Sequence, residues 1–164
     1  MILREDVMPD PARPDESQQK ELLELHEWLI ELEKLEIHRD RENIPAQDFK
    51  KSCHVLIERS GEKICIIQDR QISDMTLALS GLLGYSPNEM LGTPFARYVH
   101  RDELPRLADY YEKRRAGQEV PIIYETILRH ENESNVYVKI LTSLFVYLGK
   151  PANLAIIKVL AETR

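Results

Sequence analysis

The C-terminal part of the chain contains three runs rich in β-branched and aromatic residues, and the turns between them are very short. The runs cover residues 120–130, 134–147 and 153–160. Glu131-Asn132-Glu133 separates the first two runs, and Gly149-Lys150-Pro151 separates the last two. Turns of this length join antiparallel neighbours, because a parallel connection needs about a dozen residues or more. The sequence therefore predicts an antiparallel meander of three strands.

Both faces of the middle run carry apolar side chains. One face holds Val136, Val138, Ile140, Leu144 and Val146. The opposite face is only half polar and holds Tyr137, Lys139, Leu141, Ser143, Phe145 and Tyr147. A sheet with one solvated face alternates cleanly between apolar and polar residues. This pattern therefore favours a sheet that is covered on both sides.

A long amphipathic helix is a suitable cover for one of these faces. Residues 15–44 contain no Gly or Pro, and apolar side chains recur at helical spacing: Leu22, Leu25, Trp28, Leu29, Leu32 and Leu35. Asp15 or Ser17 can cap the start of this helix. The stripe can pack on the chain's own sheet or form a seam with a second copy. The candidates for a dimer interface are Leu22, Leu25, Trp28, Leu29 and Leu32.

Shorter elements are predicted between this helix and the meander. Residues 46–52 follow Pro45 and are interpreted as a connector. Short strands are expected at residues 55–57, 64–67 and 71–75. A helix over residues 77–83 should end at Gly84. A longer helix ending near Gly117 is expected to begin with Asp102 as a structural cap, which places Pro105 in the first turn.

Composition excludes several classes of protein. The 164 residues include 22 basic and 28 acidic side chains, and a net charge of −6 is unsuited to nucleic acid or anionic lipid. No apolar run is long enough to span a membrane, and the N-terminus lacks a secretory signal. We therefore expect a cytoplasmic protein with free thiols at Cys53 and Cys65. Residues 1–14, acidic and rich in proline, are predicted to be a disordered lead.

Residues 78–104 have the sequence ALSGLLGYSPNEMLGTPFARYVHRDEL. This segment resembles the centre of a PAS domain in its Leu-Gly-Tyr-Ser, its Met-Leu-Gly and its Val-His-x-Asp followed by an acid. Tyr124-Glu125, Tyr147-x-Gly-x-Pro-Ala and Ile156-Ile157 match later parts of the family pattern. The resemblance covers about residues 53–164, after a helix and connector at 15–52. Arg101, Thr76 and Val159-Leu160-Ala161 depart from the usual residues of the family.

The resemblance implies an α+β fold with a single antiparallel sheet of about five strands. Short helices would cover one face, and the N-terminal amphipathic helix would cover the other face or a dimer mate. PAS domains that hold haem generally take a His from the long helix, and flavin-binding members use a Cys in the helix before it. Residues 101–117 contain no His and residues 93–99 contain no Cys. Haem and flavin are therefore disfavoured, and no cofactor is expected.

The remaining chemical candidates favour binding over catalysis. His100 has no partner at a spacing that would form a metal site or a general base, so no metal and no catalytic residue are expected. The chain also lacks a phosphate-binding loop and a nucleophile elbow, and an enzyme is not expected. Candidates for a ligand pocket are Phe95, Tyr98, Val99, Tyr110 and Tyr124, although each can equally be a core residue.

These observations together predict a cytoplasmic sensory and signal-transduction module. It would form a homodimer, bind a small ligand or a partner, and signal to a downstream protein through helix packing, as the sensor part of a histidine kinase or a transcription regulator. The alternative is a ligand-free structural adaptor that mediates homodimerisation or protein–protein interaction. An open pocket inside the helix layer would favour the sensor, and a fully packed interior would favour the adaptor.

Overall fold

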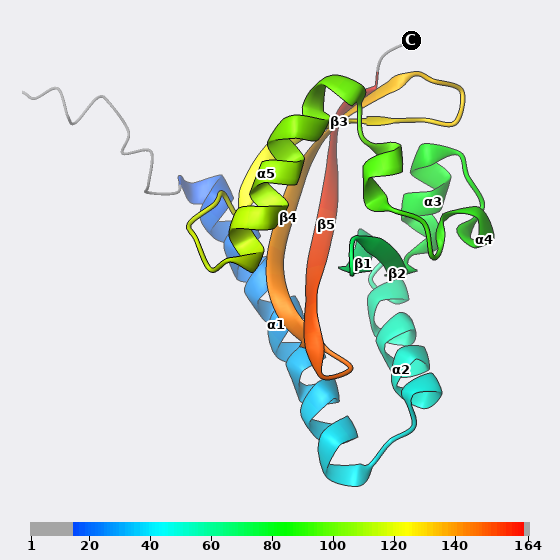
Figure 1. Ribbon diagram of the computed structural model, residues 1–164, viewed down its shortest axis with the longest axis vertical. Helices are drawn as coiled ribbons and strands as arrows, with labels where there is room; N and C mark the ends of the chain where they lie inside the picture. Colours follow the sequence, from blue (N-terminus) through cyan, green and yellow to red (C-terminus); the bar gives the residue numbers. More distant parts are fainter. Residues whose placement is uncertain (1–14, 163–164) are drawn as a thin grey trace, which may run out of the picture.

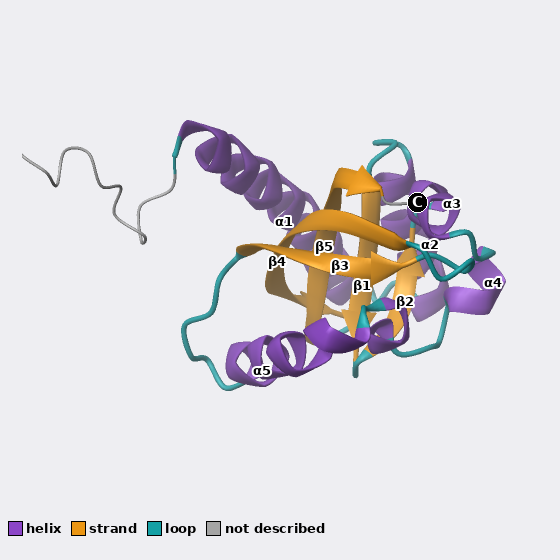
Figure 2. Ribbon diagram, turned by 90° about the horizontal axis from the view of Figure 1, so that it is seen from above, coloured by secondary structure: helices purple, strands orange, loops and turns teal. Residues whose placement is uncertain are grey.

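The computed structural model describes residues 15–162, which form one antiparallel sheet with helices on both faces (Figures 1 and 2). The strands are β1 (Lys63–Gln68), β2 (Gln71–Met75), β3 (Ile123–Arg129), β4 (Asn135–Tyr147) and β5 (Lys150–Glu162). The helices are α1 (Glu16–Glu42), α2 (Ala46–Glu58), α3 (Leu77–Leu83), α4 (Pro87–Met90) and α5 (Leu104–Arg115), with 3₁₀ turns at Phe95–Tyr98 and Arg101–Glu103. The α+β class is confirmed. The predicted disordered lead, residues 1–14, lies outside the described residues.

Three of the strands form the predicted meander. The sheet has five strands in the order β2-β1-β5-β4-β3, so β3, β4 and β5 are consecutive neighbours. β4 pairs with β3 from Leu141 to Asn135, and it pairs with β5 along almost its whole length. β1 occupies the other side of β5, and β2 forms the opposite edge of the sheet.

Each face of the sheet carries its own hydrophobic core. Val136, Val138 and Ile140 of β4 belong to the core beneath α3, α4 and α5. Leu141 of the same strand belongs to the core beneath α1 and α2. Figure 2 shows α1 and α5 on opposite sides of the sheet. The prediction that both faces need cover is therefore confirmed.

The stripe on α1 packs against the chain's own sheet. Asp15 and Gln18 form a capping box at the start of the helix, and Asn43 ends it in the left-handed conformation. Leu25 and Leu32 are 3% and 0% exposed, and Trp28 and Leu29 pack at the margin of the same core. Two ion pairs also join α1 to the sheet, Glu21 to Lys139 of β4 and Glu24 to Lys158 of β5.

Within the single chain, the stripe is used for packing on its own sheet. The predicted dimer-interface residues are either in the core or half-buried beside it: Leu22, Leu25, Trp28, Leu29 and Leu32. A dimer that used Leu25 and Leu32 would require α1 to leave its own sheet and cover that of a second chain. A dimer interface on the half-buried residues of this stripe does not require that exchange, and the interface stays a prediction.

The prediction for residues 46–57 is wrong. Neither the connector at 46–52 nor the strand at 55–57 forms, because this segment is the single helix α2. Phe49, Cys53 and Ile57 lie one helical turn apart and are all buried, whereas Val55 is 53% exposed. Burial of this helical face outweighs the β propensity of the branched residues. The predicted start of the PAS-like region at residue 53 consequently falls inside α2.

The predicted end of the helix before Gly84 is confirmed. α3 ends at Leu83, and Gly84 follows with a φ of 84°, which glycine adopts without strain. A Cβ atom at this position would lie 2.5 Å from the His130 imidazole in the β3–β4 turn. Glycine is therefore favoured by the left-handed backbone, and any larger residue would also have to displace the His130 ring.

Glu36 of α1 holds the hairpin between β4 and β5. Its carboxylate accepts the backbone N–H groups of Leu148 at 2.9 Å and Gly149 at 2.8 Å. It also forms an ion pair with Arg39 at 2.6 Å. Burial alone would raise the pKa of Glu36, but the Arg39 hydrogen bond and the two backbone donors outweigh burial and lower this pKa. The ionised carboxylate thus ties α1 to a distant turn.

We predict that Glu36→Gln lowers the free energy of unfolding by about 1–2 kcal/mol near neutral pH, because a charged acceptor becomes neutral in a partly solvated site. Folding lowers the pKa of Glu36 below its ordinary value of 4.5. The stability that Glu36 contributes to the wild-type protein is therefore present above pH 4.5 and is lost as the pH falls through the folded-state pKa. The difference between wild type and variant should disappear over the same range. Urea titrations at neutral and acidic pH measure the difference. Glu31→Gln, which removes an exposed partner of Lys34 on the same helix, is the control and should leave the midpoint unchanged.

Candidate functional site

A cavity of about 180 Å³ lies between α5 and the sheet. Its floor is formed by strand residues of β1, β4 and β5, and its roof is formed by α5 with the 3₁₀ turn that contains Phe95. Most of its lining is apolar and includes Ile67, Ile140, Ala155, Leu104 and Leu107. A cavity of about 150 Å³ with such a lining can hold a benzene-sized molecule. The space is therefore suited to a small ligand.

The structure brings three of the five predicted pocket residues to this cavity. Phe95, Val99 and Tyr124 line it. Tyr98 instead belongs to the core, where its hydroxyl lies 2.7 Å from the Thr93 hydroxyl. Tyr110 packs edge-on against the Tyr124 ring at 5.1 Å and does not line the cavity. That any of these residues contacts a ligand stays a prediction.

Sequence reasoning missed the polar residues of the cavity. Thr142 and Asn153 project from β4 and β5 into its floor, with 3% and 5% of their surfaces exposed. Arg70 and Arg114 line its rim from the β1–β2 turn and the last turn of α5. The available signal was a polar residue within an otherwise apolar strand. A polar residue in an apolar strand indicates a binding site only when a cavity is known to lie on the same face of the sheet.

Burial perturbs the ionisable groups around the cavity. The Tyr124 hydroxyl has its pKa raised to about 12, chiefly because burial disfavours the phenolate. The pKa of Arg114 is lowered by burial, which the nearby Tyr124 and Tyr110 oppose. Arg70 forms an ion pair with Glu112 and stacks 4.5 Å from the centre of the Tyr111 ring. The lining is thus largely apolar, with two cations at its edge.

The start of α5 differs from the prediction. Asp102 does not cap the helix: its side chain is 82% exposed, and its backbone N–H donates to Nδ1 of His100 at 3.0 Å. The physical reason is that a 3₁₀ turn over Arg101–Glu103 runs directly into α5, and Glu103 precedes the helix with helical backbone angles. The first turn of α5 therefore has no extended cap residue. Pro105 occupies that turn as expected.

Glu103 anchors α5 to the sheet. Its carboxylate accepts from the Thr126 hydroxyl of β3 at 2.8 Å and pairs with Arg106, whose guanidinium also donates to the Glu125 carbonyl. Burial would raise the pKa of Glu103, but the bonds from Arg106 and Thr126 outweigh it and lower the pKa. Since α5 is the roof of the cavity, this contact fixes one wall of the site.

We predict that Glu103→Gln lowers the free energy of unfolding by about 1–2 kcal/mol, because it removes a charged acceptor shared by two elements and partly screened by solvent. Asp102→Ala is the neighbouring control and should leave the urea midpoint unchanged, since its carboxylate faces solvent. Chemical denaturation of both variants at neutral pH provides the measurement. Loss of stability in Asp102→Ala but not in Glu103→Gln would contradict this assignment and support Asp102 as the cap of the helix.

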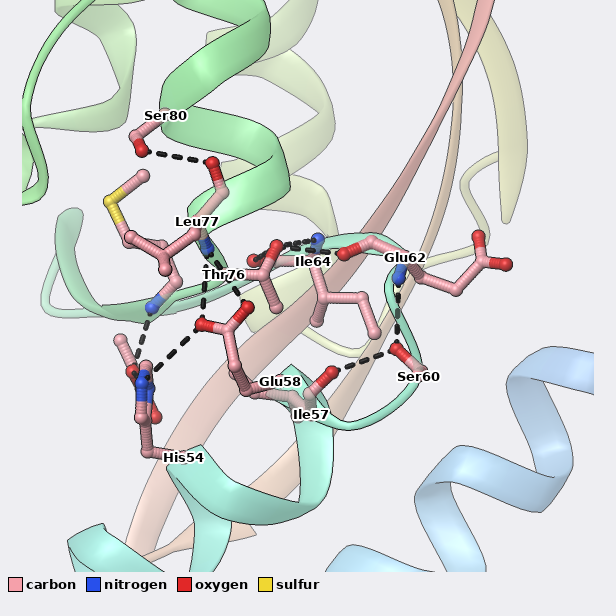
Figure 3. A network of polar contacts seen from close by, with 11 residues as sticks. His54, Ile57, Glu58, Ser60, Glu62, Ile64, Thr76, Leu77 and Ser80 are labelled. Carbon is pink, nitrogen blue, oxygen red and sulfur yellow. Dashed lines mark hydrogen bonds and ion pairs between the residues drawn. The ribbon is translucent and has the colours of Figure 1, made fainter.

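A second polar network joins α2 to the edge strand β2 and its neighbours (Figure 3). His54 of α2 lies 2.8 Å from Asp74 of β2 and 3.4 Å from Glu58, whose carboxylate accepts the Leu77 N–H at the start of α3. Buried Thr76 accepts the Ile64 N–H and donates to the Glu62 carbonyl. Burial raises the pKa of Asp74, and His54 opposes this shift. The network attaches α2 to β1, β2 and α3.

Reactive and metal-binding groups do not form a further centre in the described residues. Cys53 and Cys65 are buried free thiols, and burial raises the pKa of each to about 12, which keeps them protonated. Among residues 15–162, no three His, Cys, Asp or Glu side chains gather as metal ligands. Within the same range, no helix is long and apolar enough to span a bilayer. The absence of a cofactor or metal in the protein stays a prediction.

Solved structures with the same arrangement of elements are PAS domains. The PAS domain of an HTR-like protein from Haloarcula marismortui matches with a TM-score of 0.55 and 21% identity, over 74% of this chain and 100% of that chain. A PAS domain from a two-component sensor histidine kinase matches with a TM-score of 0.57 and 15% identity, over 71% and 100% of the two chains. The PAS-B domain of Drosophila melanogaster Cycle, solved with bound ethylene glycol, matches with a TM-score of 0.50 and 18% identity, over 60% and 99%.

The chain has a PAS fold. Identities of 15–21% make this a likeness of fold. Comparison of the sequence with protein-family models and with curated proteins finds no match. The resemblance inferred from the segment around Leu-Gly-Tyr-Ser is thus confirmed at the level of the fold. In this PAS-fold chain the cavity lies between α5 and the sheet, on the face of the sheet opposite α1 and α2.

Proposed function

We propose that this PAS domain is a cytoplasmic sensory module that binds a small ligand in the cavity beneath α5. Ligand binding changes how α1 and α2 pack on the other face of the sheet, and a downstream signalling protein responds to that change. Catalysis has no part in this mechanism. A neighbour of the same fold is the PAS domain of a two-component sensor histidine kinase, which supports a sensory role.

The observation that carries this proposal is that successive side chains of β4 and β5 face opposite sides of the sheet. One side chain lines the cavity, and the next packs under α1 and α2. Ile140, Asn153 and Ala155 line the cavity. The residues that follow them, Leu141, Leu154 and Ile156, belong to the core beneath α1 and α2. Because close-packed interiors transmit small displacements, a ligand that moves the floor of the cavity also moves the surface on which the helices rest.

The ends of α1 and α2 are held by polar contacts that can respond to such a movement. Glu36 of α1 binds the hairpin that leads into β5, only a few residues before Asn153. Lys158 of β5 pairs with Glu24 of α1 and with Glu62. The His54 network ties α2 to β2. α1 is therefore coupled to a strand that forms the cavity floor, and α2 is coupled to the neighbouring strand β2.

We predict that small probes bound in the cavity change amide hydrogen exchange in α1 and α2. Benzoate, benzamide and 4-hydroxybenzoate are suitable probes because their size matches the cavity. Exchange followed by NMR should change severalfold at core positions such as Leu25 and Cys53 when a probe binds. The cavity-filling variant Ala155→Leu should abolish both binding and the change. Binding without any change in α1 or α2 would contradict the sensory coupling.

The adaptor function is a second candidate, and one observation favours it. Leu23, Ile30 and Ile37 lie at heptad spacing on α1 and are 57%, 38% and 45% exposed. Residues at this spacing form a nearly straight line along a helix, which is the pattern that pairs helices side by side. A second copy of the chain supplies an identical line, so homodimerisation through this outer line is compatible with α1 remaining on its own sheet.

We predict that Ile30→Glu weakens self-association by about tenfold or more without loss of stability, since it places a charge in the seam but at an exposed site. Val55→Glu, at an exposed apolar position on α2, is the matched control. Sedimentation velocity over a range of concentrations measures both variants. A wild-type protein that stays monomeric at high concentration would reject homodimerisation through this line of residues.

A further inference from the structure

Arg114 is a cation without a counter-charge at the edge of an apolar cavity. It lies in the last turn of α5, is half-buried and lines the cavity. Its guanidinium donates to the Pro121 carbonyl at the long distance of 3.4 Å. Among residues 15–162 no carboxylate forms an ion pair with it. Partial burial of an unpaired charge is costly, and a bound anion would remove that cost.

The neighbouring arginines are satisfied within the chain. Arg70, the other cation on the cavity rim, pairs with Glu112 and stacks on Tyr111. Arg106, eight positions before Arg114 on the same helix, pairs with Glu103 and donates to a β3 carbonyl. Of the two arginines that line the cavity, Arg114 is therefore the one available to an external carboxylate. Its planar fork matches the two oxygens of such a group.

Asn153 supplies a second polar anchor from the opposite wall. It projects from β5 into the cavity floor and is only 5% exposed. Its Oδ1 atom is buried and has no hydrogen-bond partner in the described part of the chain. Buried amide oxygens in native proteins nearly always accept a hydrogen bond, and an orphaned one indicates a missing donor. Asn153 lines the cavity, but its Oδ1 is closed off in this packing, so a ligand hydroxyl or N–H group would be that donor once the amide turns toward the cavity.

We propose that the cavity binds a small monocarboxylate whose apolar body ends in a hydrogen-bond donor. This inference rests on the proposed function, because it names the chemical class of the ligand for the same cavity. The carboxylate pairs with Arg114 at the rim, and the donor at the far end reaches Asn153 on the floor. Ile140, Leu107 and Ala155 contact the apolar body between these two anchors. The volume of about 180 Å³ limits that body to about one aromatic ring or a short chain.

The charge preference is tested with matched probes and a matched arginine control. NMR titration of the full chain compares 4-hydroxybenzoate with its neutral analogue 4-hydroxybenzamide. We expect the carboxylate to bind about tenfold more tightly or better, as a charge-assisted hydrogen bond in a largely apolar site predicts. Arg114→Gln should reduce this ratio to near one. Arg115→Gln, which removes the same charge from the next residue but does not line the cavity, should leave it unchanged.

The donor preference is tested separately. In the wild-type protein, 4-hydroxybenzoate should bind several times more tightly than benzoate, and 4-methoxybenzoate, which lacks the donor, should lose that advantage. Asn153→Leu should equalise 4-hydroxybenzoate and benzoate while keeping the preference for a carboxylate over an amide. If Asn153→Leu does not fold, the comparison of the three probes in wild-type protein decides the point.

The outcomes separate this inference from the function on which it rests. Equal binding of 4-hydroxybenzoate and 4-hydroxybenzamide, unaffected by Arg114→Gln, would overturn the carboxylate assignment and leave a ligand cavity in place. Carboxylate binding that follows Arg114 but leaves exchange in α1 and α2 unchanged would support the ligand class and overturn the sensory coupling. Failure of every probe to shift resonances around the cavity at millimolar concentration would overturn both.

Discussion

Burial of apolar side chains on both faces of β4 and β5 is the constraint on which the rest of this structure depends. Leu154 and Ile156 are completely buried on one face, and Ala155 and Ile157 nearly so on the other. A large apolar side chain contributes about 1.5–3 kcal/mol when fully buried, so neither face can be left in water. The helix pair α1 and α2 is therefore an integral layer of the fold. Its buried residues, Leu32 and Cys53 among them, complete the second core.

The same two-sided burial gives the sheet its proposed role in signalling. The floor of the cavity and the seat of α1 and α2 are opposite sides of the same strands, one residue apart along the chain. Besides the two cores, polar contacts join these layers where elements meet, as Glu36 does at the β4–β5 hairpin and His54 does between α2 and β2. Rigid layers connected at their ends can shift relative to one another without unfolding.

Charge is distributed in a way that distinguishes structural from binding groups. Glu103 and Glu36 each have a cationic partner and backbone or hydroxyl donors, and their carboxylates hold one element against another. Arg114 and Asn153, in contrast, bring polar atoms to the cavity that no described side chain neutralises or satisfies. A folded protein usually pairs such groups internally, and those it leaves open are the ones through which an external molecule can be recognised.

Elements whose signals are local could be predicted from the amino-acid sequence. Short turns predicted the meander, the apolar stripe predicted α1, and Gly84 predicted the end of α3, because turn length, helical periodicity and left-handed glycine act within a few residues. Tertiary structure decided the rest. Residues 46–57 form a helix because Phe49, Cys53 and Ile57 are buried in the core beneath α1 and α2. Asp102 does not cap α5 because a 3₁₀ turn leads directly into that helix. Arg114 and Asn153 are separated along the chain and meet only across the cavity that the packing of α5 on the sheet creates.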